Sequence, residues 1–108
     1  MQTYGLVINL KDDSNVISEY KKFHKSVWPK VKSDILDSGI SQMKIFIFES
    51  TLFMYLEASE DFDFGLLANA SKETKEWNKL MSTLQVPVPS VNPGEWWHQL
   101  EKVYDLKW

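Results

Sequence analysis

The segment KIFIFESTLFMYL, residues Lys44–Leu56, decides the fold of this chain. Two β-prone runs, Lys44–Phe48 and Leu52–Leu56, flank Glu49-Ser50-Thr51, and this pattern is typical of a β-hairpin. Both runs are so apolar that neither face of the predicted sheet can stay in water. Helices of the same chain can cover one face, and the other must close over a pocket or pack against a second subunit. We therefore expect a homodimer.

The residues before the hairpin predict one strand and two helices. Thr3–Leu10 is short, β-branched and apolar, and the polar cluster Lys11–Asn15 ends this strand and supplies a helix cap. Apolar residues then recur at a helical interval, but Pro29 lacks an amide hydrogen and breaks a continuous helix. Proline fits well as the first residue of a new helix. The sequence thus predicts helices at about Ser14–Lys25 and Pro29–Ser38.

The residues after the hairpin predict two more helices and a last strand. Ser59-Glu60-Asp61 is expected to cap a helix through about Asn69, and Ser71 to cap a helix that carries Trp77. Gln85–Gly94 holds three of the four prolines and is expected to form no regular element. Leu100–Leu106 is a plausible final strand. This order of elements predicts an α+β fold, a ferredoxin-like sandwich formed by residues 1–108 as a single domain.

Composition excludes several classes of function. The chain has no cysteine, which removes disulfides, thiolate catalysis and sulfur-ligated metals. Its net charge of −3, with lysines and acids interspersed, gives no basic stripe for nucleic acid. With no apolar run long enough to cross a bilayer and no leader pattern, we expect a cytoplasmic protein without a membrane partner. The five tryptophans suit either a core or a pocket for sugars and other small polar rings.

His24 and Tyr20 are the first candidates for chemistry. They lie four residues apart, so they share one face of the predicted helix near its C-terminal end. A helix C-terminus stabilises protonated imidazole, which favours His24 as a general acid at neutral pH. Tyr20 could hydrogen-bond the substrate or orient the histidine ring. Alternatively, His24 is a surface histidine and Tyr20 a residue at the core boundary.

Other aromatic and acidic residues are candidates for the walls of a pocket or for a general base. The candidate walls, which could equally be core residues, are Trp28, Trp77, Trp96 and Trp97. Adjacent residues of an extended chain point to opposite faces, so only one of the last two should face a given site. The candidate bases, which could equally be surface charges, are Glu57, Glu95 and Glu101. Two histidines without cysteine make at most a weak metal site, so no metal site is predicted.

Three segments together resemble the L-rhamnose mutarotase family, which includes relatives similar to L-fucose mutarotases. They are EYKKFHKSVWP at Glu19–Pro29, the pair Glu76-Trp77 on its helix, and the end of the chain from Gly94-Glu95-Trp96-Trp97 to Leu106. The resemblance spans nearly the whole chain. It implies a dimeric ferredoxin-like α+β barrel in which each subunit holds a monosaccharide over its sheet. It also implies interconversion of the α and β anomers of a deoxy-hexose without a cofactor.

The resemblance also implies roles for individual residues. His24 matches the proton donor, Tyr20 a tyrosine that contacts the substrate, and Trp77 the first of two substrate-binding tryptophans. Asn78 stands in place of the second tryptophan, and Met43 in place of another substrate-binding tyrosine. Both changes affect sugar contacts and leave the sugar open. Two alternatives share the fold, namely a sugar-binding or regulatory module without turnover and a cofactor-free monooxygenase.

Overall fold

The computed structural model describes residues 1–65, 70–89 and 91–108 of the chain. Its elements, in chain order, are β1 (Gln2–Leu10), α1 (Ser14–His24), α2 (Pro29–Asp37), β2 (Ile40–Phe48), β3 (Thr51–Ala58), α3 (Lys72–Ser82), β4 (Gln85–Val86) and β5 (His98–Gln99). The strands form one antiparallel sheet in the order β2-β3-β1-β4, and β5 also pairs with β1. The predicted α+β ferredoxin-like fold is confirmed.

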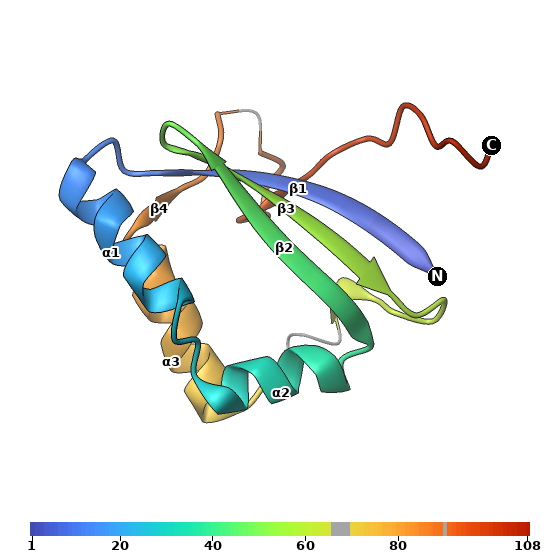
Figure 1. Cartoon of the computed structure of the whole chain (residues 1–108), viewed down its shortest axis with the longest axis horizontal. Helices are drawn as coiled ribbons and strands as arrows, with labels where there is room; N and C mark the ends of the chain where they lie inside the picture. Colours follow the sequence, from blue (N-terminus) through green and yellow to red (C-terminus); the bar gives the residue numbers. More distant parts are fainter. Residues whose placement is uncertain (66–69, 90) are drawn as a thin grey trace.

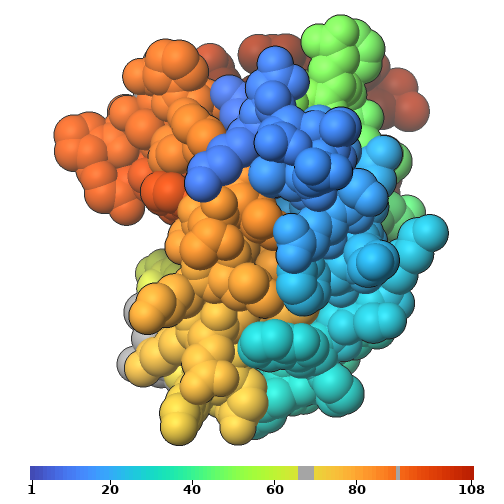
Figure 2. Space-filling view, turned by 90° about the vertical axis from the view of Figure 1, so that its left-hand side faces the viewer, coloured from blue at the N-terminus to red at the C-terminus, as the bar shows by residue number. Residues whose placement is uncertain are grey.

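Helices α1, α2 and α3 lie on one side of the curled sheet, and no helix of the described residues lies on its other side (Figure 1). Figure 2 looks onto the helices, where the side chains of α3 lie alongside those of α1 and α2. Within the described ranges, no helix is long and apolar enough to cross a membrane. The described residues therefore form a helix layer and a sheet layer, with one sheet face that none of these helices covers.

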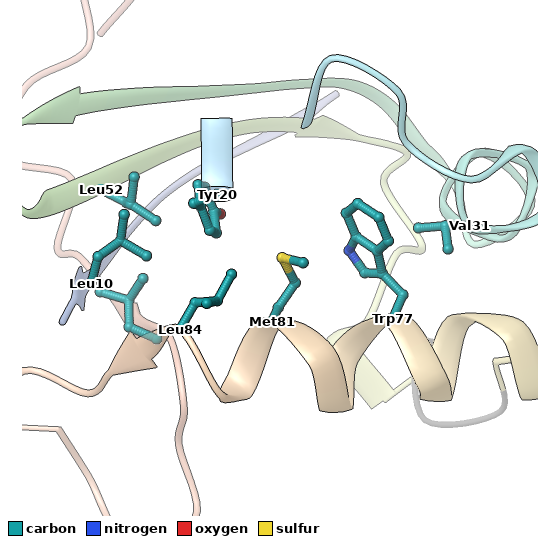
Figure 3. Packing of buried hydrophobic residues seen from close by; sticks show 8 residues of the cluster. Leu10, Tyr20, Val31, Leu52, Trp77, Met81 and Leu84 are labelled. Carbon is teal, nitrogen blue, oxygen red and sulfur yellow. The ribbon is translucent and has the colours of Figure 1, made fainter. Parts of the chain in front are cut away.

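The main core lies where α3 meets the sheet and α1. Trp77, Met81 and Leu84 project from α3 and its C-terminal end toward the sheet (Figure 3). Tyr20 of α1 belongs to the same buried cluster, as does Ile8 of β1, which is fully buried. Full burial of a side chain such as Ile8 stabilises the fold by roughly 1.5–3 kcal/mol. The central strand and α3 thus hold the helix layer on the sheet.

The helix boundaries follow from local sequence signals. Asp13 caps α1 by accepting a hydrogen bond from the Asn15 amide, and Ser71 caps α3 through the Thr74 amide. Pro29 is the first residue of α2, where its missing amide hydrogen costs nothing. These features confirm the predicted starts of all three helices.

The helix predicted from Ser59 to Asn69 is wrong where the structure describes it. Residues 60–63 are not helical, and only one 3₁₀ turn follows at residues 64–65. The side-chain amide of Gln2, near the N-terminus, donates to the backbone carbonyl oxygens of Ser59 and Glu60 at 3.0 and 2.7 Å. Phe62 is buried beside Tyr4, so a distant contact overrides the local helix signal. The rest of that prediction, residues 66–69, lies outside the described residues.

Two predictions near the C-terminus are also wrong. Gln85–Val86, expected to be irregular, forms β4, because both residues precede the first proline of that segment and pair with β1. Residues 100–106, where a strand was expected, do not form one. The backbone amide of Leu100 donates to the Gly5 carbonyl oxygen at 2.7 Å, and pairing with β1 ends there. Val103 is 80% exposed, since no second layer covers the apolar side chains of this tail.

Asp34 joins α2 to the start of α3. Its carboxylate accepts hydrogen bonds from the Ser71 amide at 3.1 Å, from the Ser71 hydroxyl and from the Thr74 hydroxyl at 2.6 Å. Lys30 Nζ lies 3.2 Å from the other carboxylate oxygen. The hydroxyls of Ser71 and Thr74 hold the pKa of Asp34 well below its usual range, because they stabilise the ionised form.

Asp34→Asn should lower the melting temperature at neutral pH, because an amide cannot accept all of these bonds. A depressed native pKa contributes stability above the ordinary carboxyl pKa, and this contribution is lost as the pH falls through the native value. The difference in melting temperature from the wild type should therefore shrink below about pH 4. Thermal unfolding followed by circular dichroism measures it. Asp37→Asn, exposed on the same helix, is the matched control, and a pH-independent difference would contradict the assignment.

Candidate functional site

A cavity of about 930 Å³ lies between the helix layer and the sheet, large enough for a small-molecule ligand. All three helices contribute to its wall, together with the helix-facing side chains of β1, β2 and β3. The C-terminal segment around residues 95–99 completes it. The sequence candidates that line this cavity are Tyr20, His24, Met43, Trp77, Asn78, Glu95, Trp96 and Trp97.

His24 is held between two aromatic rings. The Tyr20 ring stacks on the His24 ring, with centroids 4.1 Å apart and planes inclined by 24°. Trp77 meets the His24 ring edge-on at 5.4 Å. Tyr20 is only 4% exposed, and His24 is half-buried. The interpretation of His24 as an ordinary surface histidine is therefore wrong.

A backbone hydrogen bond fixes the tautomer of His24. Its Nδ1 lies 2.9 Å from the Tyr20 carbonyl oxygen, one helical turn earlier. Because a carbonyl oxygen only accepts, Nδ1 must carry the hydrogen and donate it. In the neutral ring, Nε2 is then the nitrogen with a free lone pair. His24 thus brings a proton acceptor of defined orientation to the cavity.

The expectation that the helix end keeps His24 protonated is wrong. Burial lowers the pKa of His24 from 6.5, and the hydrogen bond to the Tyr20 carbonyl only partly opposes this shift. The free-energy cost of removing the charged ring from water exceeds the stabilisation that the helix C-terminus gives it. A lowered pKa favours the neutral ring at neutral pH, in which Nε2 is able to accept a proton.

The pKa of Tyr20 is shifted in the opposite direction from that of His24. Burial raises the pKa of Tyr20 to about 12, while a hydrogen bond from the Gln85 side chain lowers it in part. Tyr20 therefore stays protonated at neutral pH and acts as a hydrogen-bond donor. The sequence gives no sign of the Gln85 contact, because a glutamine beside a proline-rich segment is ordinarily a surface residue.

Three of the four candidate tryptophans line the cavity, and the fourth packs behind one of them. Trp77 lines the cavity, whereas Trp28 does not and packs edge-on against Trp77 at 5.1 Å. Any contact of Trp28 with a ligand is thus indirect. Trp96 and Trp97 both line the cavity, against the expectation that only one of them would. The chain bends at these two residues, so the alternation of an extended strand does not apply.

Among the candidate bases, only Glu95 reaches the cavity. It accepts a hydrogen bond from the Asn92 amide at 2.9 Å, and His98 Nδ1 lies 3.1 Å from the same carboxylate oxygen. The Asn92 amide is the main cause of the lowered pKa of Glu95, which stays ionised. Glu57 and Glu101 lie outside the cavity wall. No group of three or more potential metal ligands occurs among the residues that the structure describes.

The two positions that depart from the family pattern both reach the cavity. Met43 contributes from β2 and Asn78 from the exposed side of α3. A thioether and an amide thus stand where two aromatic side chains are expected from the resemblance. Neither departure affects the stacked rings of Tyr20 and His24.

Comparison with known proteins identifies the family. A family model described as L-rhamnose mutarotase matches residues 3–106. The chain is 39% identical to a UPF0734 protein of Dictyostelium discoideum, over 99% of this chain and 91% of that protein. It is 30% identical to an L-fucose mutarotase of Xanthomonas campestris, over 98% and 89%. The solved structure of an L-rhamnose mutarotase from Formosa agariphila superposes with a TM-score of 0.74 at 27% identity, covering 98% of this chain and 99% of that one.

The tautomer and pKa of His24 can be measured directly by NMR. The Cε1–H resonance of His24 should titrate with a midpoint below 6.5, because burial disfavours the charged ring. A long-range ¹H–¹⁵N spectrum at neutral pH should show the hydrogen on Nδ1. The variant His24→Gln assigns both signals. A midpoint at or above 6.5, or a hydrogen on Nε2, would contradict this geometry.

Proposed function

Because the chain belongs to the L-rhamnose mutarotase family, we propose that it interconverts the α and β anomers of a deoxy-hexose such as L-rhamnose or L-fucose. One observation carries the proposal: His24 lines a cavity of suitable size, with its Nδ1 hydrogen committed to the Tyr20 carbonyl. Its Nε2 is thereby left for a substrate. We propose that the enzyme acts in the cytoplasm.

Anomer exchange requires the movement of one proton between two oxygens. A base takes the proton of the anomeric hydroxyl, the bond between the anomeric carbon and the ring oxygen breaks, and an open-chain aldehyde forms. The ring oxygen receives a proton, and closure on the other face of the aldehyde gives the other anomer. Both oxygens are bonded to the same carbon, so one imidazole nitrogen can serve both. We assign this shuttle to Nε2 of His24.

The aromatic wall supports the choice of a sugar as ligand. Tryptophan and tyrosine present flat apolar faces with a polar edge, which match the C–H faces and hydroxyl rim of a hexose. Trp77, Trp96 and Trp97 line the cavity, and the His24 ring meets Trp77 edge-on. Tyr20 and Trp77 are proposed substrate contacts, together with Met43 and Asn78.

His24→Gln should slow catalysed anomer exchange by about 10²–10⁴-fold, the usual contribution of a general acid-base group. Saturation-transfer NMR on L-rhamnose and on L-fucose measures the rate for each sugar. The wild-type rate should fall as the pH drops below the lowered pKa of His24, since the neutral ring is the active form. His98→Gln is the matched control. Exchange that survives in His24→Gln would overturn the proposal, and wild-type binding without exchange would indicate a binding module.

We further propose that the protein is a homodimer formed through the sheet face that carries no helix. Phe46 pairs with Phe53 across β2 and β3, and Phe53 pairs with Val7 of β1. Phe46 is 60% exposed and Phe53 is 42% exposed. With Phe48 and Tyr55, these side chains form an apolar surface that a single chain leaves in water.

Phe46→Lys should convert the dimer to a monomer, because a lysine in the centre of a dry interface is not compensated by a partner charge. Sedimentation velocity measures the molecular mass. Leu36→Lys is the matched control, since Leu36 is also exposed but lies on α2, away from this face. A wild-type protein that sediments as a monomer, or a Phe46→Lys variant that remains dimeric, would contradict the proposed interface.

A further inference from the structure

Glu95 lines the cavity, but the mechanism above gives it no role. Its side chain is 28% exposed, and its lowered pKa keeps the carboxylate ionised at neutral pH. An ionised group in a partly enclosed cavity needs hydrogen-bond donors in place of the water that it loses. The donors that the protein supplies, and those that it leaves to a ligand, therefore indicate what Glu95 does.

A tight turn places the carboxylate of Glu95. The Glu95 amide donates to the Asn92 carbonyl oxygen at 3.0 Å, and Gly94 has a positive φ of 85°. Proline at the second position and glycine with positive φ at the third are typical of a type II turn, and Pro93 and Gly94 fit this pattern. The Asn92 amide donates to Oε1 of Glu95 at 2.9 Å. Two hydrogen bonds thus join the first and last residues of the turn, and the second one holds the carboxylate.

The bonds within the protein leave part of this carboxylate free. His98 Nδ1 lies 3.1 Å from Oε1 and must donate, because an ionised carboxylate only accepts. Within the described ranges, the two hydrogen bonds of the side chain both go to Oε1. The Gln99 amide has a smaller effect on the pKa of Glu95, so these donors, three at most, face about four acceptor positions. Glu95 thus brings unused acceptor capacity to the cavity wall, on Oε2.

The two residues that follow Glu95 supply an apolar part of the same wall. Trp96 and Trp97 both line the cavity, and the Trp96 indole donates to Oε1 of the buried Gln85 at 2.7 Å. This bond uses the polar edge of Trp96, so the rest of its ring is apolar surface. A charged acceptor beside apolar rings suits a sugar, which has C–H faces and a rim of hydroxyl donors.

We propose that Glu95 is a substrate-binding residue whose Oε2 accepts a hydrogen bond from a ring hydroxyl other than the anomeric one. The inference rests on the proposed mutarotase function and assigns one more substrate contact within that site. A carboxylate stabilised by several donors is a weak base, so the proton shuttle remains assigned to His24. A hydrogen bond to an ionised acceptor is roughly twice as strong as a neutral one, which makes Glu95 an effective anchor for the sugar.

Glu95→Gln keeps the size of the side chain and removes its charge. KM for anomer exchange should rise about tenfold or more, because a hydrogen bond to a charged acceptor is weakened. The change in kcat should stay within about twofold, since a bond to a hydroxyl that does not react is equally strong in the ground state and the transition state. Saturation-transfer NMR at several sugar concentrations measures both constants. Glu101→Gln, exposed and outside the cavity wall, is the matched control, and an unchanged KM or a loss confined to kcat would overturn the inference.

Deoxy-sugars identify the hydroxyl that Glu95 binds. The probes are the 2-, 3- and 4-deoxy derivatives of L-rhamnose or L-fucose, whichever sugar binds more tightly, and NMR titration gives each Kd. One derivative should bind Glu95→Gln as tightly as it binds the wild type, because its donor is already missing. The other two should bind the variant more weakly than the wild type. If Glu95→Gln weakens the binding of all three derivatives equally, no ring hydroxyl pairs with Glu95 and the inference is wrong.

Gly94 tests whether the turn places the carboxylate. No described atom lies within 4 Å of a Cβ added at Gly94, so Gly94→Ala acts through the positive φ alone. KM should rise in Gly94→Ala, and less in Gly94→Asn, because asparagine tolerates this backbone region better. Wild-type KM values in both variants would contradict the placement of Glu95 by the turn.

Binding measurements separate this inference from the proposed function. If sugars bind with the expected dependence on Glu95 but no sugar exchanges, the mutarotase proposal fails while the role of Glu95 stands. If Glu95→Gln exchanges sugar at the wild-type rate at concentrations below KM, the role of Glu95 fails while the proposed function stands.

Discussion

The packing of α3 against the end of α1 is the contact on which the rest of the structure depends. Trp77 meets Phe23 and His24 edge-on, and with Tyr20 it belongs to the cluster that joins both helices to the central strand. Asp34 ties α2 to the N-terminal end of α3. Because α3 is held at its middle and at its N-terminal end, the helices stay joined while the helix-facing side chains of the sheet line a cavity.

Burial in this aromatic layer has opposite effects on its two titratable side chains. It lowers the pKa of His24, whose charged form is the acid, and raises the pKa of Tyr20, whose charged form is the base. At neutral pH the result is a free imidazole beside an intact phenol. One desolvated environment thus prepares an acceptor and a donor side by side, which is the pairing that ring opening and closure of a sugar require.

The parts that could be predicted from sequence are those with local signals. Asp13, Pro29 and Ser71 mark helix starts through bonds made within a few residues, and the spacing of Tyr20 and His24 alone places them on one face. The failures involve distant partners. Gln2 binds carbonyls 57 and 58 residues away, and Trp96 reaches Gln85 across 11 residues. No local pattern encodes such contacts, and the lowered pKa of His24 depends on burial that the helix alone does not provide.

The residues proposed for proton transfer are held differently from the two residues that differ from the family pattern. The Tyr20 and His24 rings stack on each other, His24 Nδ1 bonds to the Tyr20 carbonyl oxygen, and Gln85 accepts a bond from the Trp96 indole. A change at any of these side chains leaves a polar group unpaired or a ring unsupported. Asn78, in contrast, is exposed, and Met43 is a flexible thioether on the edge strand β2. Substitution at those two positions costs the fold little. The proposed proton shuttle at His24 therefore does not depend on the two positions at which this chain departs from the family pattern.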